Sequence, residues 1–232
     1  MIALKRLATD LFGLLFPELC NACGTHLYYG EKEICSKCLY QLPYTDFHLH
    51  PENAVAKQFW GRLPLQNATA LLYFKKGGKV QNLMHGLKYK GKTEVGEKLG
   101  ELLGEKLKQS NQFKNIDLIV PVPLHPKRER QRGYNQSEFI AKGLAKSLQV
   151  PHSTSHLLRT KVTQTQTKKS RYTRYENMES VFSTANNIEL IDQNILLVDD
   201  VVTTGATLEA CGNVLLQAGV KQLNIAAVAF AQ

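Results

Sequence analysis

The chain has 232 residues, of which 43% are hydrophobic and 21% charged, a balance typical of a globular protein with one sizeable core and a small appendage. No apolar run approaches the ~18 residues of a membrane span, so the sequence predicts no transmembrane segment. The net charge of +9 is uneven: residues 127–174 carry 12 basic and 2 acidic side chains, whereas residues 1–66 carry 6 of each. This concentration indicates an anionic ligand such as pyrophosphate, a nucleotide or a nucleic acid, with a solvated basic surface as the alternative.

The N-terminal residues 1–16 have an amphipathic pattern, with leucines on one helical face and Lys5, Arg6 and Asp10 among them. No small-residue cleavage site follows them. We therefore expect a docking helix in a cytoplasmic protein, with a peripheral membrane helix as the alternative.

Four cysteines lie in the next segment, residues 17–45, at the spacing C-x2-C-x11-C-x2-C: Cys20, Cys23, Cys35 and Cys38. Two pairs of thiolates at this spacing can surround a tetrahedral Zn²⁺ ion, and a hairpin this short needs a metal in place of a core of its own. Two disulfides are the rival interpretation, which a reducing compartment disfavours. Four thiolates leave no open coordination position, so the expected zinc is structural. Cys211, far along the chain, is expected to be a buried small residue.

Residues 46–67 contain Pro51, Trp60 and Pro64 without a clear period, and we interpret them as a linker that packs against another part of the chain. The main domain, residues 68–232, begins with a predicted strand over 68–74, followed by helices over 80–89 and 95–107. Lys88 and Lys90 lie in the turn between these helices and could reach a phosphate, although two lysines in a turn are more often only solvated.

A second apolar strand, residues 117–123, runs into a Pro-rich turn and then a predicted loop with four cations, and the next helix is expected to start near Ser137. The cations are Lys127, Arg128, Arg130 and Arg132. Ligands of doubly wound sheets gather outside the carboxyl ends of the strands, so this loop is suited to holding pyrophosphate.

Residues 159–177 are polar and basic and have no period, after a short candidate strand at 155–158. A compact domain rarely keeps so long an irregular stretch without a function. We expect a mobile loop that closes over the ligand and excludes water, with a flexible basic linker as the alternative.

The stretch ILLVDDVVTTGATL, residues 195–208, combines a buried strand, an acidic pair and a small hydroxyl-rich turn that opens a helix. The backbone N–H groups and hydroxyls of Thr203, Thr204, Gly205, Ala206 and Thr207 suit a phosphate dianion, and Gly205 permits a positive φ. Asp199 and Asp200 can accept hydrogen bonds from two adjacent ribose hydroxyls. A final strand over 223–230 is expected to close the sheet.

This stretch resembles the phosphoribosyl pyrophosphate loop of type I phosphoribosyltransferases, which implies the sugar 5-phosphate on residues 203–207 and the ribose hydroxyls on the aspartates. With the four cysteines, VPVPLHPKR…RGYNQSE and the R-x3-T-x2-Q pattern, the whole chain resembles the ComF family. The remaining matching residues lie in the predicted mobile loop: Arg159, Thr163, Gln166, Arg171, Arg174 and Asn177.

The resemblance implies an α/β type I phosphoribosyltransferase fold, a doubly wound and mostly parallel sheet, with a small N-terminal zinc ribbon. It also implies phosphoribosyl pyrophosphate with Mg²⁺ as ligand, a link to DNA uptake in natural transformation, and pentosyl transfer to an acceptor that the sequence does not identify. Asp199 and Asp200 would orient the ribose, and Lys127, Arg128 and Arg132 would take the leaving group. The alternative is a non-catalytic module on the same fold that senses nucleotides or handles single-stranded DNA.

Overall fold

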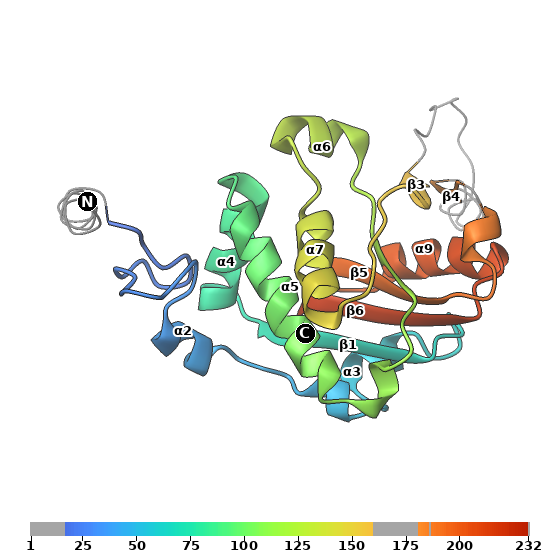
Figure 1. Cartoon of the computed structure of the whole chain (residues 1–232), viewed down its shortest axis with the longest axis horizontal. Helices are drawn as coiled ribbons and strands as arrows, with labels where there is room; N and C mark the ends of the chain where they lie inside the picture. The colour runs from blue at the N-terminus through green and yellow to red at the C-terminus, as the bar shows by residue number, and fades with distance from the viewer. Residues whose placement is uncertain (1–16, 160–180, 186, 232) are drawn as a thin grey trace, which may run out of the picture.

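The computed structural model describes residues 17–159, 181–185 and 187–231, and it confirms the predicted α/β fold with a mostly parallel sheet. Four parallel strands have the order β1-β6-β5-β2, of which β1, β6 and β5 are labelled in Figure 1. Their bounds are β1 (Asn67–Phe74), β2 (Leu118–Pro121), β5 (Asn194–Val202) and β6 (Gln222–Ala231). A separate antiparallel pair consists of β3 (Leu157–Arg159) and β4 (Phe182–Thr184).

Helices cover both faces of the parallel sheet, as the apolar runs of its strands require. On one face, α4 (Lys79–Tyr89), α5 (Thr93–Lys108) and α7 (Gln136–Leu148) share a buried cluster with Leu196 and Val198 of β5. On the other, α3 (Ala54–Gln58) and α9 (Ala206–Gln217) share a second cluster with Ile195 and Leu197. Alternate residues of β5 therefore enter opposite cores. The short elements are α2 (Ser36–Gln41), η1 (Phe47–Leu49), η2 (Asn111–Phe113), α6 (Pro126–Arg132) and η3 (Asn187–Leu190).

The helices α5 and α7 cross with their backbones in contact. A Cβ atom on Gly143 would lie 2.0 Å from the carbonyl oxygen of Glu97, and one on Gly100 would lie 2.1 Å from that of Ile140. Only glycine allows this approach. It fixes the position of α7, whose N-terminus faces the acidic end of β5.

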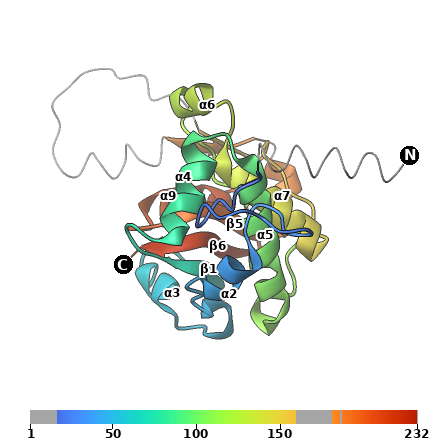
Figure 2. The ribbon, with the colours of Figure 1, turned by 90° about the vertical axis from the view of Figure 1, so that its left-hand side faces the viewer.

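The four-cysteine segment packs against α4 and is continuous with the main core (Figure 2). Ile34 and Cys38 belong to the same buried cluster as Leu83 and Met84 of α4. The Asn82 side chain donates a hydrogen bond to the Ala22 carbonyl at 2.9 Å. The segment therefore braces the helix that ends at Tyr89.

The residues predicted as a linker are packed against the body of the protein through α3 and the turn that follows it. Phe59 is fully buried, and the Asn53 side chain caps α3 while donating to the Ala68 carbonyl of β1 at 2.7 Å. Within the described residues, no helix has the length and apolar character needed to cross a membrane.

Candidate functional site

The candidate site lies where β5 and β2 end side by side. The two strands are parallel, and Val198 is in register with Pro121, so the segments that follow them adjoin. The strand β5 continues to Val202, whereas the sequence pattern predicted that the strand ends at Val198, before the two aspartates. Asp199 and Asp200 therefore lie in a hydrogen-bonded strand, because β6 runs alongside and Asp199 is in register with Ala227.

Asp199 is partly buried and faces the start of α7. Its Oδ1 atom accepts hydrogen bonds from the Ser137 hydroxyl at 3.0 Å and from the Asp200 N–H at 2.8 Å. Burial, and then the adjacent charge of Asp200, raise the pKa of Asp199 to about 7, although both hydrogen bonds act in the opposite direction. A carboxyl group that titrates near neutrality is thus held rigidly at the end of the strand.

Ser137 and its neighbour Asn135 are site residues whose roles the sequence did not indicate. Asn135 is buried, caps α7 by accepting from the Ser137 N–H at 3.1 Å, and donates to the Val122 carbonyl at 3.0 Å. The asparagine thereby joins the end of β2 to the start of α7 and directs Ser137 toward Asp199. An Asn before a helix signals a cap, but its distant partners are not encoded locally.

Asp200 is 6% exposed and points toward α4, away from the partners of Asp199. Its Oδ2 atom forms an ion pair with Lys88 Nζ at 2.5 Å. Two lysines in a turn predict solvated side chains, so the ion pair of Lys88 brings a further residue into the site.

The predicted phosphate turn has the expected geometry. Gly205 has φ of +74°, and α9 begins at the next residue, while Thr203, Thr204 and Thr207 are exposed. The turn lines a small hollow that Asp199 also borders. Within the turn the Ala206 N–H donates to Thr204 Oγ1 at 3.4 Å, and the exposed threonines border the hollow at the N-terminus of α9, where a phosphate site is expected.

The segment around α3 holds this turn from behind. The Gln58 amide donates to the Thr203 carbonyl at 2.9 Å, and the Arg62 guanidinium donates to the Thr204 carbonyl at 3.2 Å. Arg62 also pairs with Glu209 of α9. These bonds occupy the carbonyl groups of the turn and leave its donors on the open side.

Replacing Gly205 by alanine is expected to destabilise the protein by about 2–3 kcal/mol, because a left-handed φ costs about 1–2 kcal/mol and the new Cβ needs space. That Cβ would lie 2.9 Å from the ring of the buried Phe59. Gly133→Ala is the matched control, since Gly133 has φ of +82° and open space around its Cβ position. Urea denaturation should show a smaller loss, about 1 kcal/mol, for the control. Equal losses would contradict the packing argument.

The cations after β2 lie on the short helix α6, so the prediction that they lie in a loop is wrong. The His125 side chain caps α6 by accepting from the Lys127 N–H at 3.1 Å, Pro126 occupies the first turn, and Gly133 ends the helix with a positive φ. These are ordinary start and stop signals, but the many charges of the segment concealed them.

A cavity of about 370 Å³ lies between α6 and the end of α4. Of the three residues predicted to hold pyrophosphate, Arg128 and Arg132 line it, and Lys127 is not among its lining residues. The Arg132 guanidinium lies 5.3 Å from the ring centre of Tyr89 and donates to the Gln136 side chain at 2.6 Å. The cavity is therefore a cationic pocket with an aromatic wall: Lys88, Tyr89, Gly91, Arg128, Gln131, Arg132 and Tyr134.

Of the residues predicted for the mobile loop, Arg159 ends β3, and its guanidinium lies 5.1 Å from the ring centre of Phe182. Burial lowers the pKa of Arg159, and the nearby Asp199 charge opposes this shift. Thr163, Gln166, Arg171 and Arg174 lie outside the described residues.

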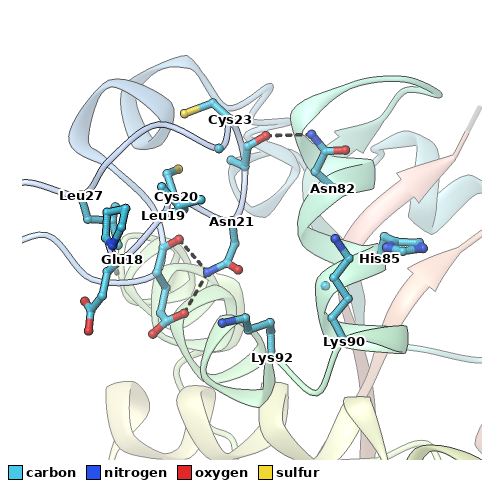
Figure 3. Close-up of a pocket in the computed structure, with 15 residues that line it drawn as sticks. Glu18, Leu19, Cys20, Asn21, Cys23, Leu27, Asn82, His85, Lys90 and Lys92 are labelled. Atoms are coloured by element: carbon cyan, nitrogen blue, oxygen red, sulfur yellow. Dashed lines mark hydrogen bonds between the residues drawn. The ribbon is translucent and has the colours of Figure 1, made fainter. Parts of the chain in front are cut away.

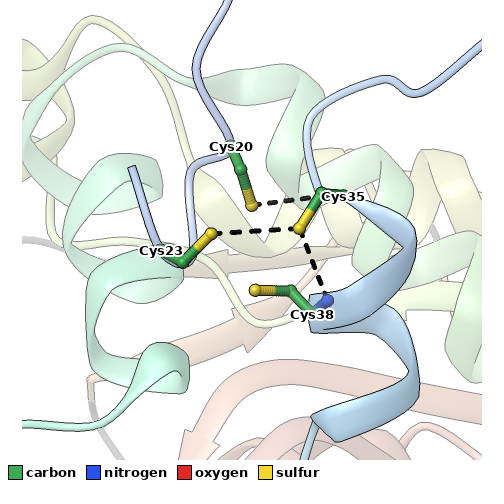
Figure 4. A group of neighbouring side chains, drawn as sticks. All are labelled: Cys20, Cys23, Cys35 and Cys38. Atoms are coloured by element: carbon green, nitrogen blue, oxygen red, sulfur yellow. Dashed lines mark hydrogen bonds between the residues drawn. The ribbon is translucent and has the colours of Figure 1, made fainter. Parts of the chain in front are cut away.

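The four cysteines come together as the spacing predicts (Figure 4). Their sulfur atoms all lie within 4.8 Å of one another, and those of Cys23 and Cys35 are 3.9 Å apart. Zn–S bonds of about 2.3 Å in a tetrahedron place the sulfurs about 3.8 Å apart, so the donor set fits zinc. Cys35 N–H donates to Cys20 Sγ and Cys38 N–H to Cys35 Sγ, which stabilises thiolates. A hydrogen bond with Thr25 lowers the pKa of Cys23 to about 6, whereas burial raises that of Cys38.

A larger cleft of about 750 Å³ separates the cysteine segment from the end of α4 (Figure 3). Lys90 and Lys92 line one wall, and Glu33, which accepts from the Asn21 amide at 3.0 Å, lines the other. Because acidic and basic groups face each other here, the cleft lacks the uniformly cationic lining of the α6 pocket.

Comparison with known proteins shows what the C-terminal part of this chain is similar to. A family model described as a phosphoribosyl transferase domain matches residues 135–232, a range that contains Asp199, Asp200 and the phosphate turn. The protein thus has the predicted type I phosphoribosyltransferase fold, with a four-cysteine cluster at its N-terminal side.

Three relatives show which proteins this chain is similar to, two of them over most of its length. Competence protein F of Haemophilus influenzae is 29% identical over 220 residues, covering 90% of this chain and 96% of that protein. DNA utilization protein YhgH of Escherichia coli K12 is 28% identical over 228 residues, covering 91% and 96%. Competence protein ComFC of Bacillus subtilis is 37% identical over 102 residues, covering 44% and 39%. The predicted ComF resemblance is confirmed, and this chain is a homologue of those proteins.

Proposed function

We propose that this protein binds phosphoribosyl pyrophosphate with Mg²⁺ and transfers its phosphoribosyl group to an acceptor during the use of imported DNA. The observation that carries the proposal is the meeting of three elements at the ends of β5 and β2: a turn of exposed donors, an acidic pair and a cationic pocket. They match, in order, the phosphate, ribose and pyrophosphate of one substrate. The link to DNA comes from the names of the relatives.

The turn would hold the 5-phosphate of the substrate. Thr203, Thr204 and Thr207 are exposed residues at the N-terminus of α9, and their hydroxyls and the N–H groups of this turn would donate to the phosphate. Helix dipole and N–H groups together favour a dianion there.

The aspartates would accept hydrogen bonds from the ribose hydroxyls. Asp200 has its charge compensated by Lys88, and Asp199 is positioned by Ser137, so both carboxylates are fixed before the sugar arrives. Hard carboxylate and hydroxyl oxygens also suit Mg²⁺, which would offset the charge of the pyrophosphate when bound.

The α6 pocket would receive the pyrophosphate. In the transfer, the bond from C1 of the ribose to the pyrophosphate oxygen breaks, the pyrophosphate leaves with the electron pair, and a nucleophile of the acceptor forms a new bond to C1. Arg128 and Arg132 would stabilise the negative charge that develops on the leaving group. The chain would thus act mostly through positioning and electrostatics.

We assign a structural zinc ion to the four cysteines and a cytoplasmic location to the protein. The sulfur distances support the zinc, and the location follows from the proposed phosphorylated substrate. A single-stranded DNA segment is the second candidate ligand, because the α6 pocket combines Arg128 and Arg132 with exposed Tyr89.

Calorimetric titration of phosphoribosyl pyrophosphate with Mg²⁺ tests the proposal. The wild type should bind, and Asp199→Asn/Asp200→Asn should weaken binding at least ~100-fold, because both ribose acceptors lose their charge. Asp192→Asn, in an exposed turn before β5, is the control and should bind as the wild type does. A wild type that fails to bind would overturn the proposal, and salt-dependent binding of a labelled single strand would then favour the DNA module.

A further inference from the structure

Lys88 occupies an unusual place between the acidic pair and the cationic pocket. It lies in the last turn of α4, and its Nζ atom is 2.5 Å from Asp200 Oδ2. The side chains of Lys88 and Asp200 are only 24% and 8% exposed, so the pair is largely removed from water. Lys88 also lines the α6 pocket with Arg128 and Arg132. One ammonium group therefore borders both halves of the site.

The end of α4 is fixed by the segment that carries the pocket arginines. The Tyr134 hydroxyl donates to the Leu87 carbonyl, and the Arg132 guanidinium packs on the Tyr89 ring at 5.3 Å. On its other side, α4 is held by the four-cysteine segment through Asn82. Lys88 is thus presented to the pocket by a braced helix end.

We propose that Lys88 is a pyrophosphate-binding residue that joins the leaving-group pocket to Asp200. The inference rests on the proposed function and adds to it a residue from outside the matched domain region, which begins at residue 135. A lysine ammonium has three donors, so it can keep its contact with Asp200 while donating to a pyrophosphate oxygen.

The charges around Lys88 explain why a cation is needed there. Pyrophosphate in the α6 pocket would lie close to the carboxylates of Asp199 and Asp200, which repel it. Arg128 is exposed, and Arg132 is engaged with Gln136, whereas Lys88 stands between the carboxylates and the pocket. Its removal would cost a direct contact and leave the repulsion uncompensated, so the effect should exceed that of losing an ordinary surface lysine.

Separate titrations of the full chain with pyrophosphate and with ribose 5-phosphate, both with Mg²⁺, test this inference. Lys88→Met should weaken pyrophosphate binding at least ~10-fold, a loss of about 1.4 kcal/mol, and change ribose 5-phosphate binding less than ~3-fold. Lys90→Met is the matched control, because Lys90 is exposed and lines the other cleft, and it should leave both affinities within ~2-fold. Lys88→Arg should restore most of the pyrophosphate affinity.

Thermal unfolding of each variant shows whether Lys88 only stabilises the fold, in which case its loss would lower the unfolding temperature without a selective loss of pyrophosphate binding. Lys88→Met leaves a buried carboxylate unpaired, so Lys88→Gln, which keeps a donor for Asp200 without the charge, repeats the test in a milder form. Unchanged pyrophosphate affinity in both variants, or equal losses for both ligands, would overturn the inference alone. A wild type that binds neither ligand would overturn the proposed function and this inference with it.

Discussion

Cys35→Ser is expected to reduce bound zinc from about one ion per chain to less than about 0.1 and to unfold the ribbon, because three thiolates cannot close the tetrahedral site. Cys35 is 5% exposed, lies 3.9 Å from Cys23, and accepts a hydrogen bond from the Cys38 N–H. A zinc-finger-like site contributes on the order of 10 kcal/mol of binding energy, far more than this small segment gains from burial. Metal analysis of the purified protein measures the loss.

Outside the four-cysteine segment, residues 17–45, the effect of Cys35→Ser should become smaller with distance from that segment. Ile34 and Cys38 share a core with Leu83 of α4, so unfolding the ribbon should expose that helix and lower the thermal midpoint of the whole chain. The phosphate turn is braced instead by Gln58 and Arg62 on the opposite face. Binding of ribose 5-phosphate at low temperature should therefore change less than about 3-fold, whereas pyrophosphate binding through Lys88 should suffer more.

Cys211→Ser provides the control for the zinc measurement. Cys211 is fully buried on α9 and is not one of the four clustered thiols. Its replacement should lower stability, because a hydroxyl enters an apolar core, and leave the zinc content unchanged. Full zinc content in Cys35→Ser would contradict the four-thiolate assignment.

The parts of the site that lie within one continuous stretch could be predicted from sequence. Residues 195–208 encode a buried strand, a carboxylate pair and a turn with Gly205 at positive φ, and each of these features depends on near neighbours. The cysteine cluster was predictable for the same reason, since two short pairs define it. Local sequence patterns thus predicted the turn at residues 203–207 and the cluster of four cysteines.

The side-chain contacts within the site could not be predicted from local sequence patterns, because they join residues that are distant in the chain. Lys88 and Asp200 pair through the packing of α4 beside the end of β5, and Ser137 reaches Asp199 because α7 is held against α5. Nothing near Lys88 distinguishes it from Lys90, which faces a different cleft. The sequence predicted a loop in place of helix α6 for a different reason. The capping residues of α6 are local signals, but its high density of charged residues is more typical of a loop.

The raised pKa of Asp199 should also make the free energy of unfolding depend on pH. The pKa of Asp199 is raised from 3.8 to about 7 in the folded protein, so between these values the folded state binds a proton that the unfolded chain does not. The stabilisation that protonated Asp199 contributes to the folded state is therefore fully present below pH ~4. It is lost as the pH rises from there through ~7. At pH 8 Asp199 is ionised, and the wild type carries the cost of this partly buried charge beside Asp200.

Asp199→Asn should remove this cost while keeping the shape of the protonated carboxyl. Below pH ~4, where Asp199 is protonated in both the folded and the unfolded chain, the variant and the wild type should unfold at similar urea concentrations, which provides the internal control. At pH 8 the variant should be more stable by about 2 kcal/mol, roughly half of what the full shift corresponds to, because Asp199 is only partly buried and its charge is partly screened. The same variant should lose binding of the ribose, since a neutral amide is a weaker acceptor for its hydroxyls. A stability difference that stays constant from pH ~4 to ~8 would mean that Asp199 is ionised without penalty. A difference that grows with pH, together with the loss of ribose binding, would show that the ligand site contains a carboxylate that destabilises the fold.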